Sequence, residues 1–250
     1  MAKHLRQWNH AKYEQYLSMG RGFGEGKNYT PWILVQDFSS QGTVSRVSGY
    51  KTGRVHHFLS KNELNYFYIL EWSDKVIDIR EQFPMINVEL AMDIAKKAGI
   101  KYPCDRKSGF PYVLTCDFMI TTTDGLKART IKSSQELTNK RTLEKLEIER
   151  RYWETIGIDW AIVTENEISV KKAKFIEWIY DANQLPAHLK EERIINSVIE
   201  NCDNTSIHKV ALETDKRFGL VAGSGMRIIK YLLLNKLVNY DYENYCIGIN

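Results

Sequence analysis

The spacing of apolar residues changes partway along the chain. Up to about residue 168, short apolar runs typical of strands alternate with stretches in which apolar residues recur every three or four positions, as in helices. From about residue 169 onward the helical spacing dominates. We therefore predict an α/β domain over residues 1–168, with a mixed sheet flanked by helices, and a mainly helical domain over residues 169–250.

The elements of the first domain follow from these runs. Between the fourth and fifth apolar runs lies Asp124-Gly125, a pair that favours the tight turn of a hairpin. Helices are predicted at residues 8–19, from Ser60 onward, at 89–98 and at 139–155. Strands are predicted at residues 32–36, 43–50, 76–79, 113–120, 128–132 and 160–164.

The end of the chain has the element order of a winged helix-turn-helix. A helix at 207–218, a glycine-rich turn at 219–224, a second helix at 226–235 and a strand at 237–242 follow one another. A protein-binding role stays open beside DNA binding. The apolar run in the second helix is also typical of a plain helical core.

Basic residues gather in this last region. Residues 206–236 carry six basic against two acidic side chains, an excess that equals the formal charge of +4 of the whole chain. Such a balance permits nucleic acid as a partner without requiring it. The basic residues are Lys209, Lys216, Arg217, Arg227, Lys230 and Lys236.

Composition excludes several classes of protein. The chain has 250 residues, 43% of them hydrophobic and 26% charged, which fits a folded protein with a real core. Its four cysteines show no Cys-x-x-Cys spacing, which argues against a zinc site or a disulfide framework and favours a reduced, cytoplasmic setting. We expect no membrane association, because the chain starts without an apolar leader and no run approaches the roughly 18 apolar residues of a membrane span.

An acidic residue interrupts one of the apolar strands. Asp117 precedes three apolar residues, at a position where a charge is costly unless it is paired or binds a metal. Neighbouring strands lie about 5 Å apart, so the hairpin brings Asp117 near Lys132. With Glu63 on an upstream helix, these residues form a minimal set for metal-assisted phosphodiester hydrolysis. The carboxylates would hold Mg²⁺, and the lysine would orient water or stabilise charge on the phosphate.

Two of these residues also have a purely structural interpretation. Glu63 stands three residues after Ser60, the spacing of a capping box in which the glutamate carboxylate accepts the serine backbone N–H. Lys132 ends a strand, where an exposed lysine can oppose edge-to-edge aggregation. Asp117 has the weakest structural alternative of the three.

Other polar residues are expected to be structural. Glu149 lies at the margin of an apolar helical stripe and is interpreted as solvated or ion-paired. For His56 and His57, packing is preferred over DNA contact. The alternating glycines of residues 20–26 are interpreted as a flexible loop, because no strand precedes them and no Gly-Lys-Ser/Thr follows, as a phosphate-binding loop requires.

Several long sequence segments in the first domain carry a family resemblance. They are Lys51-Thr-Gly-Arg-Val-His-His57, Asp78-Ile-Arg-Glu-Gln-Phe-Pro84 and Arg141-Thr-Leu-Glu-Lys-Leu-Glu-Ile-Glu-Arg-Arg-Tyr-Trp153, together with Asp117-Phe118. In this order they resemble the TnsA family, the endonuclease subunits of Tn-seven-like cut-and-paste transposons, over residues 20–168. The resemblance implies a restriction-endonuclease-like catalytic domain followed by a winged-helix domain. It also implies catalytic roles for Glu63, Asp117 and Lys132.

One position departs from the pattern that the resemblance implies. The family usually has glutamine two residues before the lysine, whereas this chain has Thr130, which offers only a short hydroxyl. We expect Mg²⁺, or Mn²⁺ as a substitute, to be held by Glu63, Asp117 and the backbone carbonyl of Ile131. A second metal would be harder to hold. Thr130 is expected to be a bystander or to act through a water molecule.

The resemblance also implies partners. This subunit would hydrolyse the strand at the 5′ ends of the transposon DNA, and a TnsB-like transposase would cut and join the 3′ ends. A TnsC-like ATPase regulator would contact the winged domain. Two alternatives stay open: a stand-alone restriction or repair nuclease, and a catalytically silent docking subunit, for which Thr130 is the only support.

Overall fold

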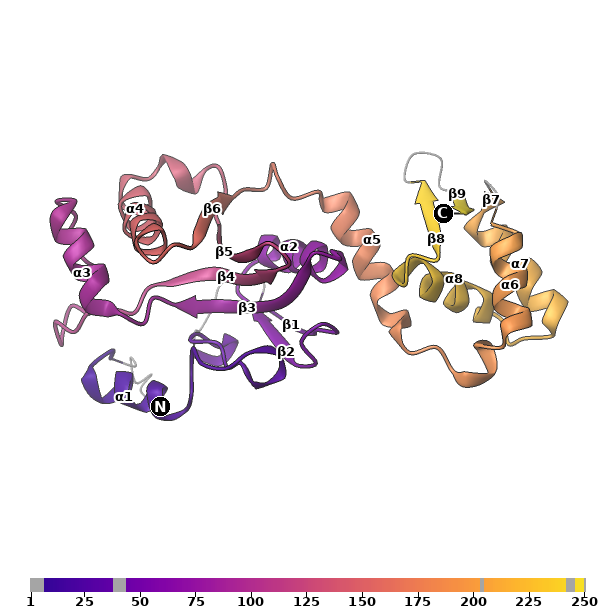
Figure 1. Ribbon diagram of the computed structural model, residues 1–250, viewed down its shortest axis with the longest axis horizontal. Coiled ribbons are helices and arrows are strands. Elements are labelled where there is room, and N and C mark those ends of the chain that lie inside the picture. The colour runs from indigo at the N-terminus through magenta and orange to yellow at the C-terminus, as the bar shows by residue number, and fades with distance from the viewer. Residues whose placement is uncertain (1–6, 38–43, 203–204, 242–245, 250) are drawn as a thin grey trace, which may run out of the picture. The chain divides into compact units, whose positions relative to one another are not determined.

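The computed structural model describes residues 7–37, 44–202, 205–241 and 246–249 (Figure 1). It divides into two compact units, Met1–Ser169 and Val170–Asn250. We call them the α/β unit and the C-terminal unit and describe each by itself. Among the helices that the structure describes, none combines the length and the apolar content of a membrane span.

A mixed four-stranded sheet forms the centre of the α/β unit. Its strands are β3 (Val76–Pro84), β4 (Thr115–Thr122), β5 (Gly125–Ile131) and β6 (Asp159–Val163), in that order across the sheet. β3, β4 and β5 pair antiparallel, whereas β6 runs parallel to β5. The predicted mixed sheet is confirmed, and the Asp-Gly turn joins β4 to β5 as expected.

Helices α3 (Val88–Lys97) and α4 (Lys140–Thr155) pack together against the sheet (Figure 1). Their buried residues share one hydrophobic core with β4 and β5, in which Trp153 and Met119 are almost completely inaccessible. Asn139 caps α4 by accepting the backbone N–H groups of its first turn, which explains why the helix begins where its spacing predicted.

A second aromatic layer joins the sheet to helix α2 (Lys61–Trp72). The ring of Phe58 contacts those of Phe67 and Phe118, and the three residues come from three separate elements. Phe58 belongs to β2 (Val55–Phe58), which pairs with β1 (Ser45–Ser48). We did not predict β2, because its two histidines hide the alternation of buried and outward residues.

The strand predicted at residues 32–36 is wrong. These residues form bends and enter a short 3-10 turn, η2 (Val35–Asp37). The carboxylate of Asp37 accepts the Leu34 backbone N–H and pairs with Arg21, and these interactions fold the backbone back on itself. Trp32 packs into an aromatic cluster with α1 (His10–Ser18) instead of joining a sheet.

The C-terminal unit combines helices with a small sheet of the order β7-β9-β8. The predicted helix at 207–218 is confirmed, and the following helix begins two residues earlier than predicted. The elements are α5 (Val170–Tyr180), α6 (Glu192–Glu200), α7 (Ile207–Phe218), α8 (Ser224–Leu234), β7 (Thr205–Ser206), β8 (Val238–Asp241) and β9 (Cys246–Ile249). Short 3-10 helices complete the described chain: η1 (Gly26–Asn28), η3 (Glu136–Thr138), η4 (Asp181–Asn183) and η5 (Ala187–Leu189).

The turn between α7 and α8 is held tightly. The Asp215 carboxylate accepts the backbone N–H groups of Gly223 and Gly225, both at 2.7 Å. A Cβ on Gly225 would lie 2.3 Å from the carbonyl oxygen of Ala211, so only glycine allows the two helices to approach this closely. The apolar residues of α8 then form the core of the unit: Ile228, Ile229, Leu232 and Leu233 are buried.

Candidate active site

Asp117 lies at an opening in the sheet. The Cα pairs between β3 and β4 include Glu81 with Phe118 and Phe83 with Cys116, so Gln82 faces Asp117 between two paired positions. On the other side, the pairing of β4 with β5 stops at Phe118, the residue that follows Asp117. Beyond that point the Asp117 carboxylate, in place of the β4 backbone, accepts the Ile131 backbone N–H at 2.7 Å.

The predicted lysine lies against this carboxylate. The ammonium of Lys132 is 3.4 Å from Asp117 Oδ2 and donates to the carbonyl of Ile131 at 2.8 Å. Burial alone would lower the pKa of Lys132, but the carboxylates of Asp117, Glu149 and Glu136 raise it above its ordinary value. Lys132 is therefore a cation at neutral pH and is not a free edge lysine.

Glu63 reaches the same site from the first turn of α2. Ser60 Oγ caps the helix by accepting the Glu63 backbone N–H at 3.2 Å, and the Glu63 carboxylate accepts the Leu59 backbone N–H at 3.0 Å. The capping-box interpretation expected the Glu63 carboxylate to accept the backbone N–H of Ser60. In the structure it accepts the backbone N–H of Leu59. Burial, and then the neighbouring charge of Asp117, raise the pKa of Glu63 to about 7. Two carboxylates thus share one site, and the charge of Asp117 makes a charge on Glu63 more costly.

Gln82 joins the two carboxylates and was missed by our sequence analysis. Its side-chain Nε2 donates to Glu63 Oε2 and to Asp117 Oδ1, each at 3.3 Å. Gln82 stands in one of the sequence segments that carry the TnsA resemblance, but its polar neighbours led us to end the strand at residue 79. In the structure, β3 continues to Pro84, and Arg80, Glu81 and Gln82 are all buried.

Thr130 and Glu149 form a separate contact beside the site. The Thr130 hydroxyl donates to the Glu149 carboxylate, which also accepts the indole N–H of Trp160 at 3.1 Å. The expectation that Glu149 is solvated or ion-paired is wrong, because it is buried and bonded to neutral groups. Burial raises the pKa of Glu149 to about 7. The hydroxyl of Thr130 is thereby directed to Glu149.

A buried charged cluster anchors β3 next to Gln82. The carboxylate of Glu81 accepts hydrogen bonds from the Arg54 guanidinium at 2.8 Å, the His57 backbone N–H at 3.0 Å and a ring nitrogen of His56 at 2.7 Å. Burial alone would raise the pKa of Glu81, but the hydrogen bonds from Arg54 and His56 lower it to about 2. His56 is thus a packing residue, in line with the preferred interpretation.

The oxygen donors of the site suit a hard cation. Carboxylate oxygens of Glu63 and Asp117 and the carbonyl of Ile131 are ligands that Mg²⁺ accepts. Within the described ranges, no group of three or more His, Cys, Asp or Glu side chains is arranged to hold a metal, so neutral oxygens would have to complete the coordination of a cation bound here. In the structure, N–H groups of Gln82 and Lys132 approach these same oxygens. This arrangement is expected where the oxygens favour a positive charge beside them.

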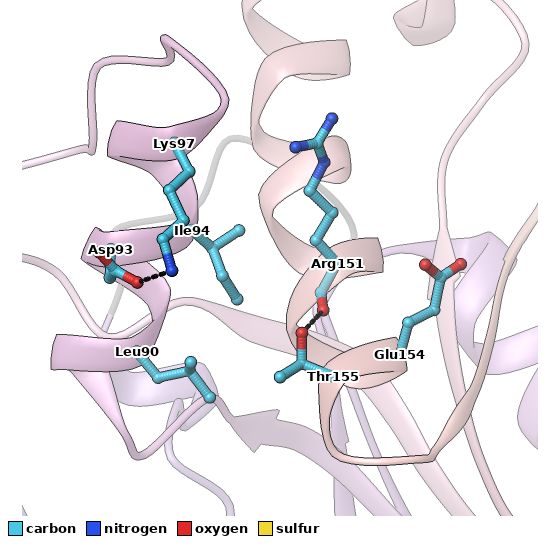
Figure 2. A pocket seen from close by; sticks show the side chains of 7 residues that line it. All are labelled: Leu90, Asp93, Ile94, Lys97, Arg151, Glu154 and Thr155. Carbon is cyan, nitrogen blue, oxygen red and sulfur yellow. Dashed lines mark hydrogen bonds and ion pairs between the residues drawn. The ribbon is translucent and has the colours of Figure 1, made fainter.

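A cavity of about 420 Å³ between α3 and α4 contains none of these residues. Figure 2 shows the ammonium of Lys97 paired with Asp93 across one turn of α3. Arg151, on the opposite wall, pairs with Glu147. Both basic groups of this cavity thus pair with an acidic residue of their own helix. The remaining lining residues are Leu90, Ile94, Glu154 and Thr155.

Comparisons with known proteins identify the family. Residues 73–165 match the model of the TnsA-like endonuclease N terminal, and residues 167–241 match that of the TnsA endonuclease C terminal. The chain is 36% identical over 247 residues to the transposon Tn7 transposition protein TnsA of Escherichia coli, covering 96% of this chain and 89% of that protein. The chain belongs to the TnsA endonuclease family.

The two TnsA family models cover different parts of the chain. The N-terminal family model includes Asp117, Thr130 and Lys132 but starts after Glu63. The C-terminal model spans most of the C-terminal unit. TnsA membership supports a DNA endonuclease that acts in transposition and recombination.

Proposed function

We propose that this chain is a Mg²⁺-dependent DNA endonuclease subunit of a cut-and-paste transposase. It hydrolyses the strand at the 5′ ends of the transposon, while a TnsB-like transposase cuts and joins the 3′ ends. One observation carries the proposal: the buried carboxylates of Glu63 and Asp117 meet beside the cationic Lys132, and Gln82 links the two carboxylates. The division of labour between the strands is supported by the family resemblance.

In this proposal, Glu63, Asp117 and the carbonyl of Ile131 hold the metal. When bound, Mg²⁺, or Mn²⁺ in its place, lowers the pKa of water and offsets the charge of the scissile phosphate. The residues present fit a divalent cation, because burial, and then repulsion by the Asp117 carboxylate, raise the pKa of Glu63 to about 7. Such repulsion is relieved by a cation between them.

Lys132 acts as a fixed positive charge in this mechanism. Its raised pKa keeps the ammonium protonated at neutral pH, so it cannot take a proton from the attacking water. Its contact with Asp117 holds the charge at the site, where it stabilises the negative charge that develops on the phosphate. The lysine therefore orients and stabilises, and it does not serve as the base.

Replacement of Lys132 tests this role. We expect Lys132→Met to lower the rate of 5′-strand cleavage by about 10²- to 10³-fold, because a charge-stabilising donor is lost. Lys132→Arg should recover part of the rate, since the charge remains. The measurement is single-turnover cleavage of transposon-end DNA with the transposase partner present. Cleavage by Lys132→Met at the wild-type rate would show that the charge has no part in the reaction.

The C-terminal unit is proposed to be a winged-helix module that docks a TnsC-like ATPase regulator. A cavity of about 340 Å³ is lined by aromatic, aliphatic and basic residues, including Phe175, Trp178, Met226 and Lys174. An apolar site with a basic rim suits a partner segment that is acidic with an apolar anchor. The alternative, a DNA reader, has fewer free charges than the sequence suggested, since Arg217, Arg227 and Lys230 all make contacts within the unit.

Burial and existing contacts decide which residues of the C-terminal unit can test the docking role. The apolar residues of α8 offer no docking surface, because they are buried in the core of the unit. Charge reversal at Lys230 would disturb packing, because its ammonium pairs with Asp181 and lies over the Trp178 ring. The side chains of Lys209 and Lys216 are exposed and better suited to a charge reversal.

Two variants of the full chain separate docking from DNA reading. We expect Met226→Glu to weaken binding of the ATPase regulator about tenfold or more, because a charge enters the apolar cavity. The double variant Lys209→Glu, Lys216→Glu should leave regulator binding unchanged. Binding of each variant to the regulator and to duplex DNA is measured at several salt concentrations. The opposite pattern, with DNA affinity lost in the lysine variant and regulator binding intact in Met226→Glu, would assign the unit to DNA.

A further inference from the structure

The side chain of Gln82 occupies the centre of the carboxylate pair. Its Nε2 group donates to both Glu63 and Asp117, at 3.3 Å in each case, and the residue is 2% exposed. A buried amide that serves two carboxylates at once is poorly placed for a purely structural role, because each carboxylate has other donors. Glu63 also accepts the Leu59 N–H, and Asp117 accepts the Ile131 N–H.

The backbone holds Gln82 in an unfavourable conformation to achieve this. Its φ is 49°, in the left-handed region that residues with a Cβ avoid; among the described non-glycine residues only Lys236 shares that sign of φ. Such strain persists where the surroundings enforce it, and it gathers at functional sites. Here the Gln82 carbonyl accepts the Trp32 N–H at 3.3 Å, and the preceding Glu81 is fixed by Arg54.

The oxygen of the Gln82 carboxamide is bonded in a way that permits the amide group to rotate by half a turn. Gln82 Oε1 accepts the hydroxyl of Thr115 at 3.3 Å. A hydroxyl both donates and accepts, so it can bond either the oxygen or the nitrogen of the amide. A half-turn of the carboxamide would therefore keep the bond to Thr115 and present Oε1 to Glu63 and Asp117.

A divalent cation would favour that turned state. Oxygen is the ligand that Mg²⁺ and Ca²⁺ prefer, and an amide oxygen is suitable. The hydroxyl of Thr130 is directed to Glu149, which leaves the Gln82 amide as the neutral side chain already in contact with both carboxylates. The N–H groups of the amide suit the carboxylates only while no cation lies between them.

We propose that Gln82 belongs to the metal site, donating from Nε2 to Glu63 and Asp117 in the metal-free protein and turning to offer Oε1 to the bound cation. This inference rests on the proposed function, since it requires that Glu63 and Asp117 bind a divalent cation. It assigns to β3 a side-chain amide like the glutamine that the family usually has two residues before the lysine, where this chain has Thr130.

Metal-induced thermal stabilisation of the full chain, without DNA, tests this inference. A ligand that binds only the folded state stabilises it by an amount that grows with the logarithm of the ligand concentration relative to Kd, so titrations with Ca²⁺ and Mn²⁺ yield apparent Kd values. We expect Gln82→Met, which keeps the size of the side chain, to raise the metal Kd about tenfold or more. Gln82→Gly suits the left-handed backbone and should show the same loss if Gln82→Met folds poorly.

A third variant is expected to lower the metal Kd, whereas the first two are expected to raise it. Gln82→Glu adds a third carboxylate, so we expect a lower Tm in EDTA from like-charge repulsion and a metal Kd about tenfold tighter than that of the wild type. A residue that merely packed would lower Tm without tightening the metal. Gln15→Met, at an exposed position of α1, is the matched control and should leave both Tm and the metal Kd unchanged.

The outcomes separate this inference from the proposed function. If Asp117→Asn loses the metal effect while Gln82→Met and Gln82→Gly keep the wild-type Kd, the metal site stands and the role of Gln82 is overturned. Weaker metal binding by Gln82→Glu would also overturn it, because the amide would then be needed only as a donor. A wild-type protein whose Tm does not respond to metal would overturn both the proposed metal dependence and this inference.

Discussion

Asp117→Asn should abolish 5′-strand cleavage while leaving the chain folded. The variant keeps an oxygen that can accept the Ile131 backbone N–H, which lies 2.7 Å from the carboxylate in the wild type. It removes one of the two carboxylate charges that would hold the metal. We expect the cleavage rate to fall by about 10³-fold or more, equivalent to several kcal/mol of barrier.

Cleavage of transposon-end DNA, together with near-UV circular dichroism and Tm, measures this effect. Asp124→Asn is the matched control, because Asp124 is an exposed aspartate in the hairpin turn that follows β4. It should cut at the wild-type rate. Undiminished cutting by Asp117→Asn at saturating Mg²⁺ would remove Asp117 from the mechanism.

The choice of asparagine follows from the structure. If the Asp117 carboxylate were unpaired, its burial would be costly and Asp117→Ala would not destabilise the protein. The carboxylate is not unpaired: it accepts from Ile131, Gln82 and Lys132. Alanine would leave the buried N–H of Ile131 without its acceptor, at a cost of about 1–3 kcal/mol. Loss of cleavage by the alanine variant would therefore be harder to separate from loss of structure.

Arg54→Met should destabilise the α/β unit strongly. The Arg54 side chain is 8% exposed and its partner, the Glu81 side chain, is 0% exposed, so removal of the guanidinium leaves a buried carboxylate with less compensation. Breaking a buried pair from one side typically costs about 3–5 kcal/mol. Urea denaturation at pH 7 measures the change. A loss below about 1 kcal/mol would show that Glu81 does not depend on Arg54.

The same pair predicts how stability changes with pH. The pKa of Glu81 is lowered from 4.5 to about 2 in the folded protein. An acid with a lowered folded-state pKa contributes stability that is fully present above its unfolded pKa and is lost as the pH falls through the folded value. The wild type should thus lose this contribution between about pH 4.5 and pH 2, and Arg54→Met should lose less over the same range.

An exposed arginine supplies the control for Arg54. Arg150 pairs with Glu147 and Glu154 on the surface of α4, where its side chain is 38% exposed. Surface ion pairs are worth about 0–1 kcal/mol, so Arg150→Met should change the free energy of unfolding by less than that. Equal losses from the two variants would mean that burial of the Arg54 pair has no energetic consequence.

Local signals account for the parts of the fold that the sequence predicted. The Asp-Gly turn set the hairpin of β4 and β5, and the caps at Ser60 and Asn139 set the starts of α2 and α4. Because the hairpin register follows from its turn, the proximity of Asp117 and Lys132 followed as well. These features depend on residues close together in the sequence.

The features that sequence reasoning missed depend on distant residues. Gln82 and Glu81 look like the polar end of a strand until Arg54, Glu63 and Asp117 are seen around them. Glu149 looks solvated until Thr130 and Trp160 cover it. Burial of polar groups is set by tertiary partners, and neither periodicity nor local propensity contains that information.

Strand-specific mapping of breaks at transposon ends, made by this chain together with a TnsB-like transposase, tests the central claim most directly. We predict breaks in the 5′-ended strands only when Mg²⁺ or Mn²⁺ is present. These breaks should disappear with Asp117→Asn, while the transposase still cuts the 3′ ends. Breaks in the 5′-ended strands that persist with Asp117→Asn would contradict the assignment of this site as the nuclease.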